Sequence, residues 1–461
     1  MQLSNYWIKK NEIIDFNKRP AGYRYNFWLI YTAILLVTQA CLSIRAVCKA
    51  FKVFSTVIPA ITHIPSRSTI RLWMSKFGLH KLVQPKEVAK DWSIILDHTI
   101  QIGKLKILIV LGLRLSHLPF NRSLTLADVQ PLALLPMQSS TGQKIEEVLS
   151  NLKSELGTIR QVVADQGSDI KLGVNLYREK DADCEYINDI VHKLAHLLQE
   201  ELKKDRTWEE LSKRASESRT KLLQTEYAHL IPPQRRDKAR YLNLEELIKW
   251  SYRILTGLQG DQLTLKDLEF LFRQFAWVYG LSDGIEELHQ LWQITSITRD
   301  WVRNFGVQTE TATILSTKLQ ALELNFRSQQ FADKILQFVS EQSVKAKPYE
   351  RLLGTSEIIE SLIGLVKHHS NTQSRSGFTG SILIAAALTG KIDEESVFNA
   401  LTSVKTANVE KWEQTYFAAT TQKKRAKFYR ETPLMEDERI IQTNGTESGT
   451  CIILDFEPEI G

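Results

Sequence analysis

The chain has 461 residues, of which 43% are hydrophobic and 24% charged, with a net charge of +6 from 59 basic and 53 acidic residues. This is the composition of an ordinary globular protein, so the chain is neither disordered nor fibrous as a whole. The mild positive surplus allows a nucleic-acid partner without requiring one. The cysteines at positions 41, 48, 184 and 451 form no CxxC pair, which argues against a disulfide framework and favours a reducing, cytoplasmic location, at the nucleoid if the source is bacterial.

An apolar run, FWLIYTAILLV at Phe27–Val37, is the most membrane-like stretch of the sequence. It is too short to cross a bilayer and follows a polar start that suits a signal peptide poorly. We therefore expect a buried helix and no membrane association.

Three helical segments are expected within residues 1–85. The third, SRSTIRLWMSKFGL at Ser66–Leu79, begins with a serine N-cap and carries Arg67, Arg71 and Lys76. Three short helices with a basic last member predict a helix-turn-helix domain whose third helix enters a DNA major groove. The alternative is a small helical domain with a solvated basic face.

Residues 90–195 change in character and predict a sheet. Apolar or β-branched runs at Ser93–Ile102, Leu105–Leu115 and Thr125–Met137 are expected to be strands, followed by an amphipathic helix that Gly157 ends. A fourth strand runs into Asp165 and a fifth covers Cys184–Asn188. Three adjoining strands followed by α/β alternation predict an α/β fold with a mixed five-stranded sheet, in the order of the ribonuclease H-like fold.

The chain from residue 196 to 345 contains helical patterns and no strand pattern, and a large all-helical insertion is expected there. Helices return over 346–435 as the last part of the core, with a basic cluster at Lys423–Arg430, and an acidic tail follows at 436–461. The insertion contributes two groups that could contact nucleic acid. The first group is four tryptophans, which either stack on a base or fill the core: Trp250, Trp277, Trp292 and Trp301. The second group is a basic cluster that could contact phosphates: Arg235, Arg236, Lys238 and Arg240.

Three carboxylates have settings that require explanation. Asp97 lies inside the first strand, Asp165 ends the fourth strand, and Glu360 lies in a helical stretch with apolar neighbours. Singly, Asp165 could be a turn former and Glu360 a solvated helix position, but a buried carboxylate such as Asp97 is costly without a partner. If strands one and four are adjacent, Asp97 and Asp165 lie together and repel unless they share a proton or a cation. Asp169, a few residues later, is expected to cap a helix.

These residues resemble a known enzyme family. LDHT, VADQGSD and TSEIIESLIG look like the three blocks of a DDE transposase of the ribonuclease H-like superfamily, with a helical insertion similar to that of hAT-type elements. The resemblance implies that Asp97, Asp165 and Glu360 are catalytic and bind two Mg²⁺ or Mn²⁺ ions. It also implies a role at the site or at DNA for Lys367, seven residues after the Glu, and for His192 of the DIVH motif. The alternative for DIVH is a helix cap at Asp189 with an ordinary histidine.

The resemblance implies a transposase that binds the terminal inverted repeats of a mobile element, cuts there, and joins the freed end to target DNA. It also implies double-stranded DNA as the partner and at least a homodimer when the ends are brought together. Two alternatives stay open, namely a transposase-derived DNA-binding protein without catalysis and a non-mobile nuclease of the same fold.

Overall fold

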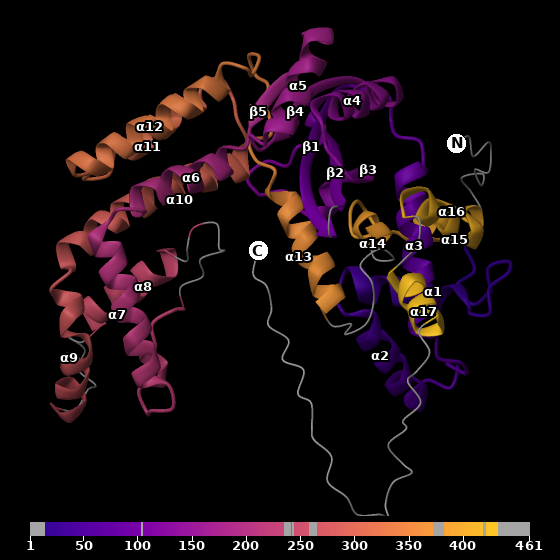
Figure 1. Ribbon diagram of the computed structural model, residues 1–461, viewed down its shortest axis with the longest axis horizontal. Coiled ribbons are helices and arrows are strands. Elements are labelled where there is room, and N and C mark those ends of the chain that lie inside the picture. The colour runs from indigo at the N-terminus through magenta and orange to yellow at the C-terminus, as the bar shows by residue number, and fades with distance from the viewer. Residues whose placement is uncertain are drawn as a thin grey trace, which may run out of the picture.

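The computed structural model describes residues 14–102, 105–234, 241, 244–257, 265–371, 382–417 and 421–431. A sheet at the centre carries two limbs of helices, one on either side (Figure 1). One limb is formed by the middle of the chain. The other is formed by its first and last helices together.

The central sheet has five strands in the order β3-β2-β1-β4-β5. β1 pairs antiparallel with β2, and β2 with β3, whereas β1–β4 and β4–β5 are parallel pairs. This confirms the mixed sheet and the ribonuclease H-like order expected from the sequence. The strands are β1 (Ala89–Ile102), β2 (Leu105–Arg114), β3 (Gln130–Met137), β4 (Gly157–Ala164) and β5 (Glu185–Asn188).

The third strand starts later than its sequence pattern suggests. Leu126–Asp128 forms a short 3₁₀ turn, in which the Asp128 carboxylate accepts hydrogen bonds from the Thr125 N–H (2.8 Å) and hydroxyl (2.7 Å). A local turn that satisfies its own backbone competes with strand pairing, so the ladder begins only at Gln130.

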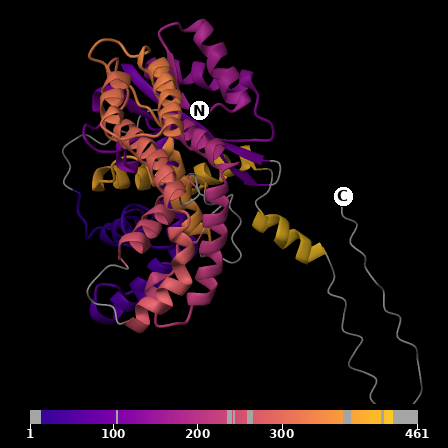
Figure 2. The ribbon, with the colours of Figure 1, turned by 90° about the vertical axis from the view of Figure 1, so that its left-hand side faces the viewer.

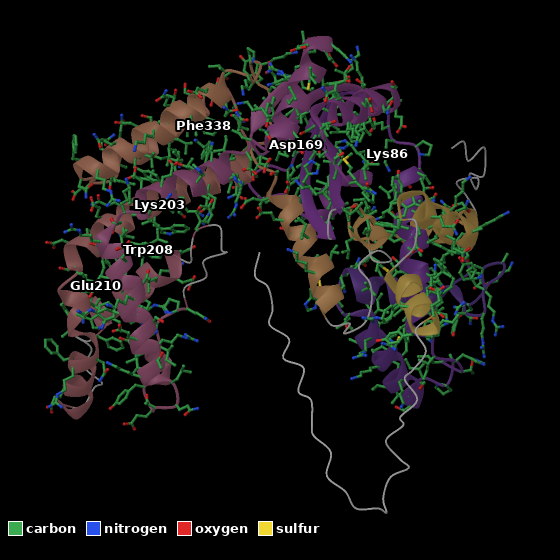
Figure 3. All side chains as sticks on the ribbon, viewed as in Figure 1. Lys86, Asp169, Lys203, Trp208, Glu210 and Phe338 are labelled. Atoms are coloured by element: carbon green, nitrogen blue, oxygen red, sulfur yellow. The ribbon has the colours of Figure 1, made fainter. Side chains whose placement is uncertain are left out.

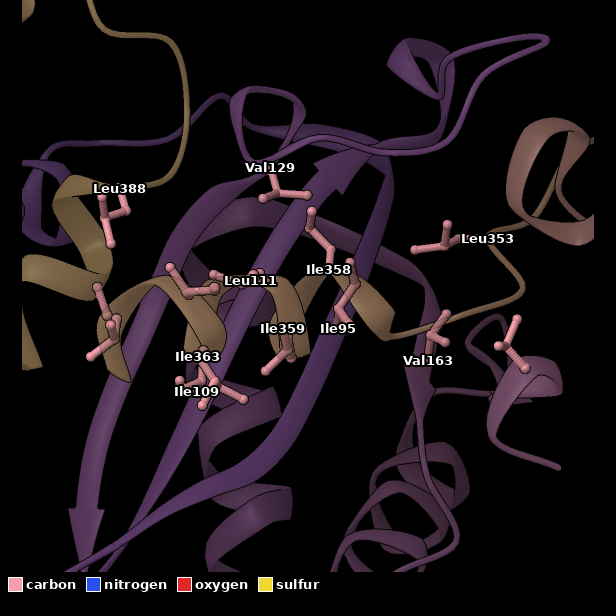
Figure 4. Close-up of a cluster of buried hydrophobic side chains, with 14 of the residues drawn as sticks. Ile95, Ile109, Leu111, Val129, Val163, Leu353, Ile358, Ile359, Ile363 and Leu388 are labelled. Atoms are coloured by element: carbon pink, nitrogen blue, oxygen red, sulfur yellow. The ribbon is translucent and has the colours of Figure 1, made fainter. Parts of the chain in front are cut away.

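The two faces of the sheet bury different helices because alternate side chains of a strand point to opposite sides. Ile94 and Leu96 belong to the core beneath α4 (Gly142–Leu156) and α5 (Ser168–Lys180). Ile95 belongs to the other core, where α13 (Glu357–Asn371) crosses the sheet (Figure 4). Gly157 ends α4 as expected, with a φ of +94° and the Ala89 carbonyl so near that an added Cβ would lie 2.5 Å from its oxygen.

The first and last helices of the described chain pack into one body. α3 contacts the C-terminal helices as well as α1, α2 and strand β3. At Gly78 the approach is so close that an added Cβ would lie 1.8 Å from the Leu383 carbonyl oxygen. The helices are α1 (Phe27–Thr38), α2 (Ile44–Val57), α3 (Arg67–Val83), α14 (Ile382–Ala387), α15 (Glu394–Ser403), α16 (Thr406–Tyr416) and α17 (Thr421–Glu431), the last of which projects from the body (Figure 2).

The apolar run at Phe27 is a buried helix, as expected, with Ile30 and Ile34 fully covered. Of the helices that the structure describes, none is both long enough and apolar enough to span a bilayer.

The DNA contact expected of Lys76 in the third helix requires correction. The second half of α3 is buried, and Lys76 is only 7% exposed. Its ammonium donates to the Tyr23 hydroxyl at 2.9 Å and lies over that ring, and burial lowers the pKa of the lysine. The second half of α3 is therefore covered by protein and cannot contact DNA, whereas its first turn stays open to solvent. Arg67 is exposed and Arg71 half-buried at the start of the helix.

The insertion is helical throughout its described part, with no strand between Asp189 and Lys345, as expected. α10 is its centre and contacts α6, α8, α11 and α12, and the helices lie together as an elongated arm (Figure 2). The arm consists of α6 (Ile190–Leu202), α7 (Arg206–Leu222), α8 (Leu244–Gly257), α9 (Leu265–Tyr279), α10 (Ser282–Phe305), α11 (Thr311–Gln320) and α12 (Phe326–Ser343).

The insertion tryptophans divide by burial. Trp250 and Trp292 are 8% and 6% exposed and belong to the core, which favours the packing interpretation for both. Trp277 lies against Trp250, and Trp301 stacks on Phe305 with ring centres 4.5 Å apart. The basic residues Arg235, Arg236, Lys238 and Arg240, and the acidic tail, lie outside the described residues.

Candidate active site

Asp97 lies inside strand β1, next to the point where the parallel strand β4 ends and Asp165 follows. Ile95 of β1 is paired with Val163 of β4, and each aspartate follows two residues later. A step of two keeps a side chain on the same face, so both carboxylates lie on the α13 side of the sheet. Both are half-buried.

The setting of Asp97 disfavours its charge. The pKa of this carboxyl is raised to about 7, by burial first and then by the negative charges of Asp165, Glu360 and Asp189, against a hydrogen bond from the His98 backbone N–H. A proton on one carboxyl, or a positive charge beside it, relieves repulsion of this kind. Three other acidic groups therefore act on Asp97, one that follows strand β4 and two at the starts of helices.

The third predicted carboxylate, Glu360, is delivered by a segment fixed to the sheet. Leu352 forms an antiparallel bridge with Val307, which follows α10 within the insertion. The Gln161 side chain of β4 accepts from the Leu353 N–H (3.0 Å) and donates to the Leu353 carbonyl, and it also accepts from the Ser93 hydroxyl at 3.1 Å. A buried glutamine thus joins two strands to the chain that enters α13.

Asp189 makes a second connection to the same segment. One of its carboxylate oxygens caps α6 by accepting from the His192 N–H at 2.8 Å. The other accepts from the Ser356 N–H at 2.9 Å and from the Ser356 hydroxyl. Asp189 is 3% exposed, so the cap interpretation of this residue is correct, and the cap also fixes the start of α13.

The packing of α13 decides which glutamate faces the site. Ile358, Ile359 and Ile363 lie against the sheet (Figure 4). Glu357 receives two hydrogen bonds from the Arg303 guanidinium of α10, one at 2.6 Å, and the site cavity does not include it. Glu360 is exposed and lines that cavity together with Asp97.

The cavity has a volume of about 510 Å³ and three walls. Strand β1 forms the first wall with Asp97 and His98, and helices α6 and α13 form the second and the third. The side chains on the two helical walls are His192, Ala195, His196 and Gln199 of α6 and Glu360, Ile363, Gly364 and Lys367 of α13. The predicted residues His192 and Lys367 therefore both lie at the cavity of Asp97 and Glu360, and both are exposed, whereas Asp165 is not among the residues that line it. A second cavity of about 230 Å³ reaches Glu360 from the side of Arg303.

The three predicted ligands offer carboxylate oxygens, which suit Mg²⁺ better than a metal that prefers nitrogen or sulfur. Asp97 and Asp165 fit as neighbouring ligands. In the described part of the chain, however, no three His, Cys, Asp or Glu side chains are gathered closely enough to hold a metal ion together. Glu360 lies on the wall of the same cavity and would have to approach the pair.

A cluster that the sequence did not indicate adjoins the pair. His98 Nε2 lies 3.0 Å from Asp169 Oδ2 and 2.8 Å from Ser140 Oγ, and its Nδ1 is buried with no hydrogen-bond partner. Asp169 does not cap α5, whose cap position is Gly167, but turns its carboxylate to His98 from the first turn of that helix. Figure 3 shows Asp169 near the middle of the molecule, between the two limbs. Only the adjacency of His98 to Asp97 could have indicated the cluster.

These features define an α/β protein with a ribonuclease H-like sheet, an all-helical insertion, and an acidic site where strand β4 ends beside strand β1. No protein-family model matches the chain, and no curated protein does. Among solved structures the chain is similar to the Drosophila P element transposase strand transfer complex, at 12% sequence identity and a TM-score of 0.35, over 82% of this chain and 92% of that one. At that score, the assignment of the fold rests on the order and direction of the strands.

Proposed function

We propose that the chain is a DNA transposase that cuts double-stranded DNA at the ends of its element and joins the freed ends to target DNA. The observation that carries the proposal is that Asp97 lies beside Asp165 on one face of the sheet and lines one cavity together with Glu360. The apolar surroundings that raise the pKa of Asp97 make a bound cation the natural partner of this group.

In this proposal Asp97, Asp165 and Glu360 would hold two Mg²⁺ or Mn²⁺ ions once Glu360 approaches the pair. Such ions would supply activation of the attacking oxygen and stabilisation of the leaving oxygen in an in-line phosphoryl transfer. The protein's part is to position the DNA. His192 and Lys367 face the cavity from opposite helices and contact the phosphates on either side of the scissile bond. A homodimer or larger assembly brings two ends together.

The test is cleavage of a supercoiled plasmid that carries the coding region with its natural flanking DNA, in Mg²⁺ or Mn²⁺. Nicks should map to fixed positions outside the coding region. Asp97→Ala, Asp165→Ala and Glu360→Ala should each lower the rate at least about 10³-fold, since each removes a metal ligand. Glu147→Ala is the matched control because this exposed glutamate lies on α4, which covers the opposite face of the sheet. Full cleavage by the three variants would refute the proposed active site.

A DNA-binding protein that does not cut is the second candidate. It is favoured by the fact that the three carboxylates are not gathered into a ready metal site in the described structure. Specific binding to the flanking DNA without nicks in either metal would support it. Nicks at scattered positions, lost in the same three variants, would instead indicate a non-mobile nuclease.

A further inference from the structure

One exposed face of α2 carries a row of positive charge. Arg45, Lys49 and Lys52 are all exposed, and their spacing of four and three residues places them on one side of a helix. The row extends over about 10 Å at 1.5 Å per residue. Arg67, exposed at the start of α3, lies near enough to the Cys48 thiol of α2 to lower its pKa against the larger effect of burial, and so adds a fourth charge beside the row.

No acidic group balances these charges in the neighbouring sequence. The segment from residue 16 to 86 contains 11 lysines and arginines and no aspartate or glutamate. Within the described residues, none of the four side chains takes part in an ion pair. A solvated helix face normally mixes both signs of charge, so an unbalanced row of this kind produces a positive potential suited to a polyanion.

We infer that the exposed face of α2, with Arg67, is the surface that holds the backbone of duplex DNA. The inference rests on the proposed DNA-binding function but not on cleavage. The proposed DNA contact lies on α2, next to α3, and does not involve Lys76 of α3, which is buried. Basic side chains spaced along a helix reach successive phosphates, and the exposed Val53 and Val57 on the same helix supply apolar contact with sugars or thymine methyl groups.

An anionic membrane is the other polyanion that this face could bind, and the burial of the apolar side of α2 argues against it. Helices that lie on membranes turn Trp, Phe or Leu side chains toward the lipid. In α2 the large apolar residues Ile44, Val47 and Phe51 face the protein and are buried. The outside of the helix retains the basic row and two valines. Figure 1 places α2 at the lower end of its limb, beyond α13.

The test uses the full chain and a fluorescent duplex of about two helical turns with random sequence, in a titration of salt. The triple variant Arg45→Gln, Lys49→Gln, Lys52→Gln should bind at least tenfold more weakly at low salt. The slope of log K against log salt should become shallower by about 2 to 3, because each phosphate contact contributes about 0.9 to it. The control is Lys391→Gln, Lys405→Gln, Lys411→Gln, which removes the same charge from exposed positions of the same limb and should bind within twofold of the wild type.

Equal losses in the two triple variants would show a general effect of net charge and overturn the assignment, as would wild-type affinity of the α2 variant. Binding of the wild type and of the α2 triple variant to phosphatidylserine vesicles is measured in parallel. If the α2 variant loses vesicle binding but binds the duplex like the wild type, this face is a membrane surface and the proposal is wrong. Asp97→Asn separates this inference from the proposed function. This variant should bind the duplex like the wild type but should not cut it, so duplex binding tests the α2 surface and cleavage tests the active site.

Discussion

At the scale of single residues, Asp97 is the group whose chemistry the fold alters most. It stands on a sheet face otherwise occupied by aliphatic side chains such as Ile95 and Ile109, and its neighbour across the parallel pair is another carboxylate. Its pKa is raised from an ordinary 3.8 to about 7. In the absence of a cation, the ionised carboxylate therefore weakens the fold at neutral pH.

Asp97→Asn should stabilise the metal-free protein, and the gain should depend on pH. Below about pH 4 the carboxyl is protonated in both folded and unfolded chains, so the variant and the wild type should be alike. The wild type loses stability as the pH rises from there through the folded pKa of about 7, and the difference levels off above it. At about pH 8 the variant should gain about 1–3 kcal/mol in free energy of unfolding, since a tenfold change in proton affinity corresponds to ~1.4 kcal/mol.

Urea denaturation at several pH values measures this difference. Millimolar Mg²⁺ should reduce the gain, because a cation stabilises the wild-type site and not the amide. Glu147→Gln serves as the control and should show no pH-dependent gain. A constant difference between Asp97→Asn and wild type at every pH would contradict the account of the raised pKa.

At the scale of elements, the sequence was informative where a pattern is local. Alternating apolar residues and turn residues predicted all five strands, and Gly157 predicted the end of α4. The pairing of Asp97 with Asp165 followed from the strand order. Lys76 shows where local patterns fail. Helical spacing identifies a basic position, but it does not show which other helices cover that position. Lys81, one turn and a half later, donates to the Thr389 carbonyl 308 residues away, and no local pattern contains that contact.

The connection between α6 and α13 was also beyond local prediction, since Asp189 and Ser356 are 167 residues apart. Asp189→Ala removes the cap of α6 and leaves the buried Ser356 N–H without its acceptor. We expect a loss of about 2–4 kcal/mol in free energy of unfolding. Ser356→Ala loses only the hydroxyl hydrogen bond and should cost about 1 kcal/mol.

The functional consequence distinguishes this connection from an ordinary cap. If Asp189 sets the position of Glu360, cleavage should fall by about tenfold or more in Asp189→Ala at a temperature where the variant is fully folded by circular dichroism. Asp393→Ala is the control because Asp393 caps α15 through the Ser396 N–H at 2.9 Å, away from the site. It should cost about 1 kcal/mol and leave cleavage unchanged. Equal cleavage in the two variants at equal folded fraction would mean that Asp189 is only a cap.

At the scale of the whole molecule, the two ends of the chain depend on one another. α3 lies between the sheet and the C-terminal helices, and Leu79 shares a small buried cluster with Leu383, Val404 and Val409. The Tyr23 hydroxyl, near the start of the chain, donates to the Leu401 carbonyl at 2.9 Å. The first helices are therefore not an independent unit that could be cut away at residue 85.

Truncation tests this dependence directly. A chain ending at Asn371 loses α14 to α17 and exposes the surface of α3 that α14, α15 and α16 cover, at a cost of about 1.5–3 kcal/mol for each large apolar side chain uncovered. We expect residues 14–86 to become the most rapidly cleaved part of the chain in limited proteolysis and duplex binding through α2 to be lost. A chain ending at Phe417 loses only α17 and the residues after it, and should keep the melting temperature and proteolytic pattern of the full chain. If the chain ending at Asn371 resists proteolysis as well as the one ending at Phe417, then α1 to α3 form a self-sufficient domain, and the burial of α3 by the C-terminal helices contributes little to its stability.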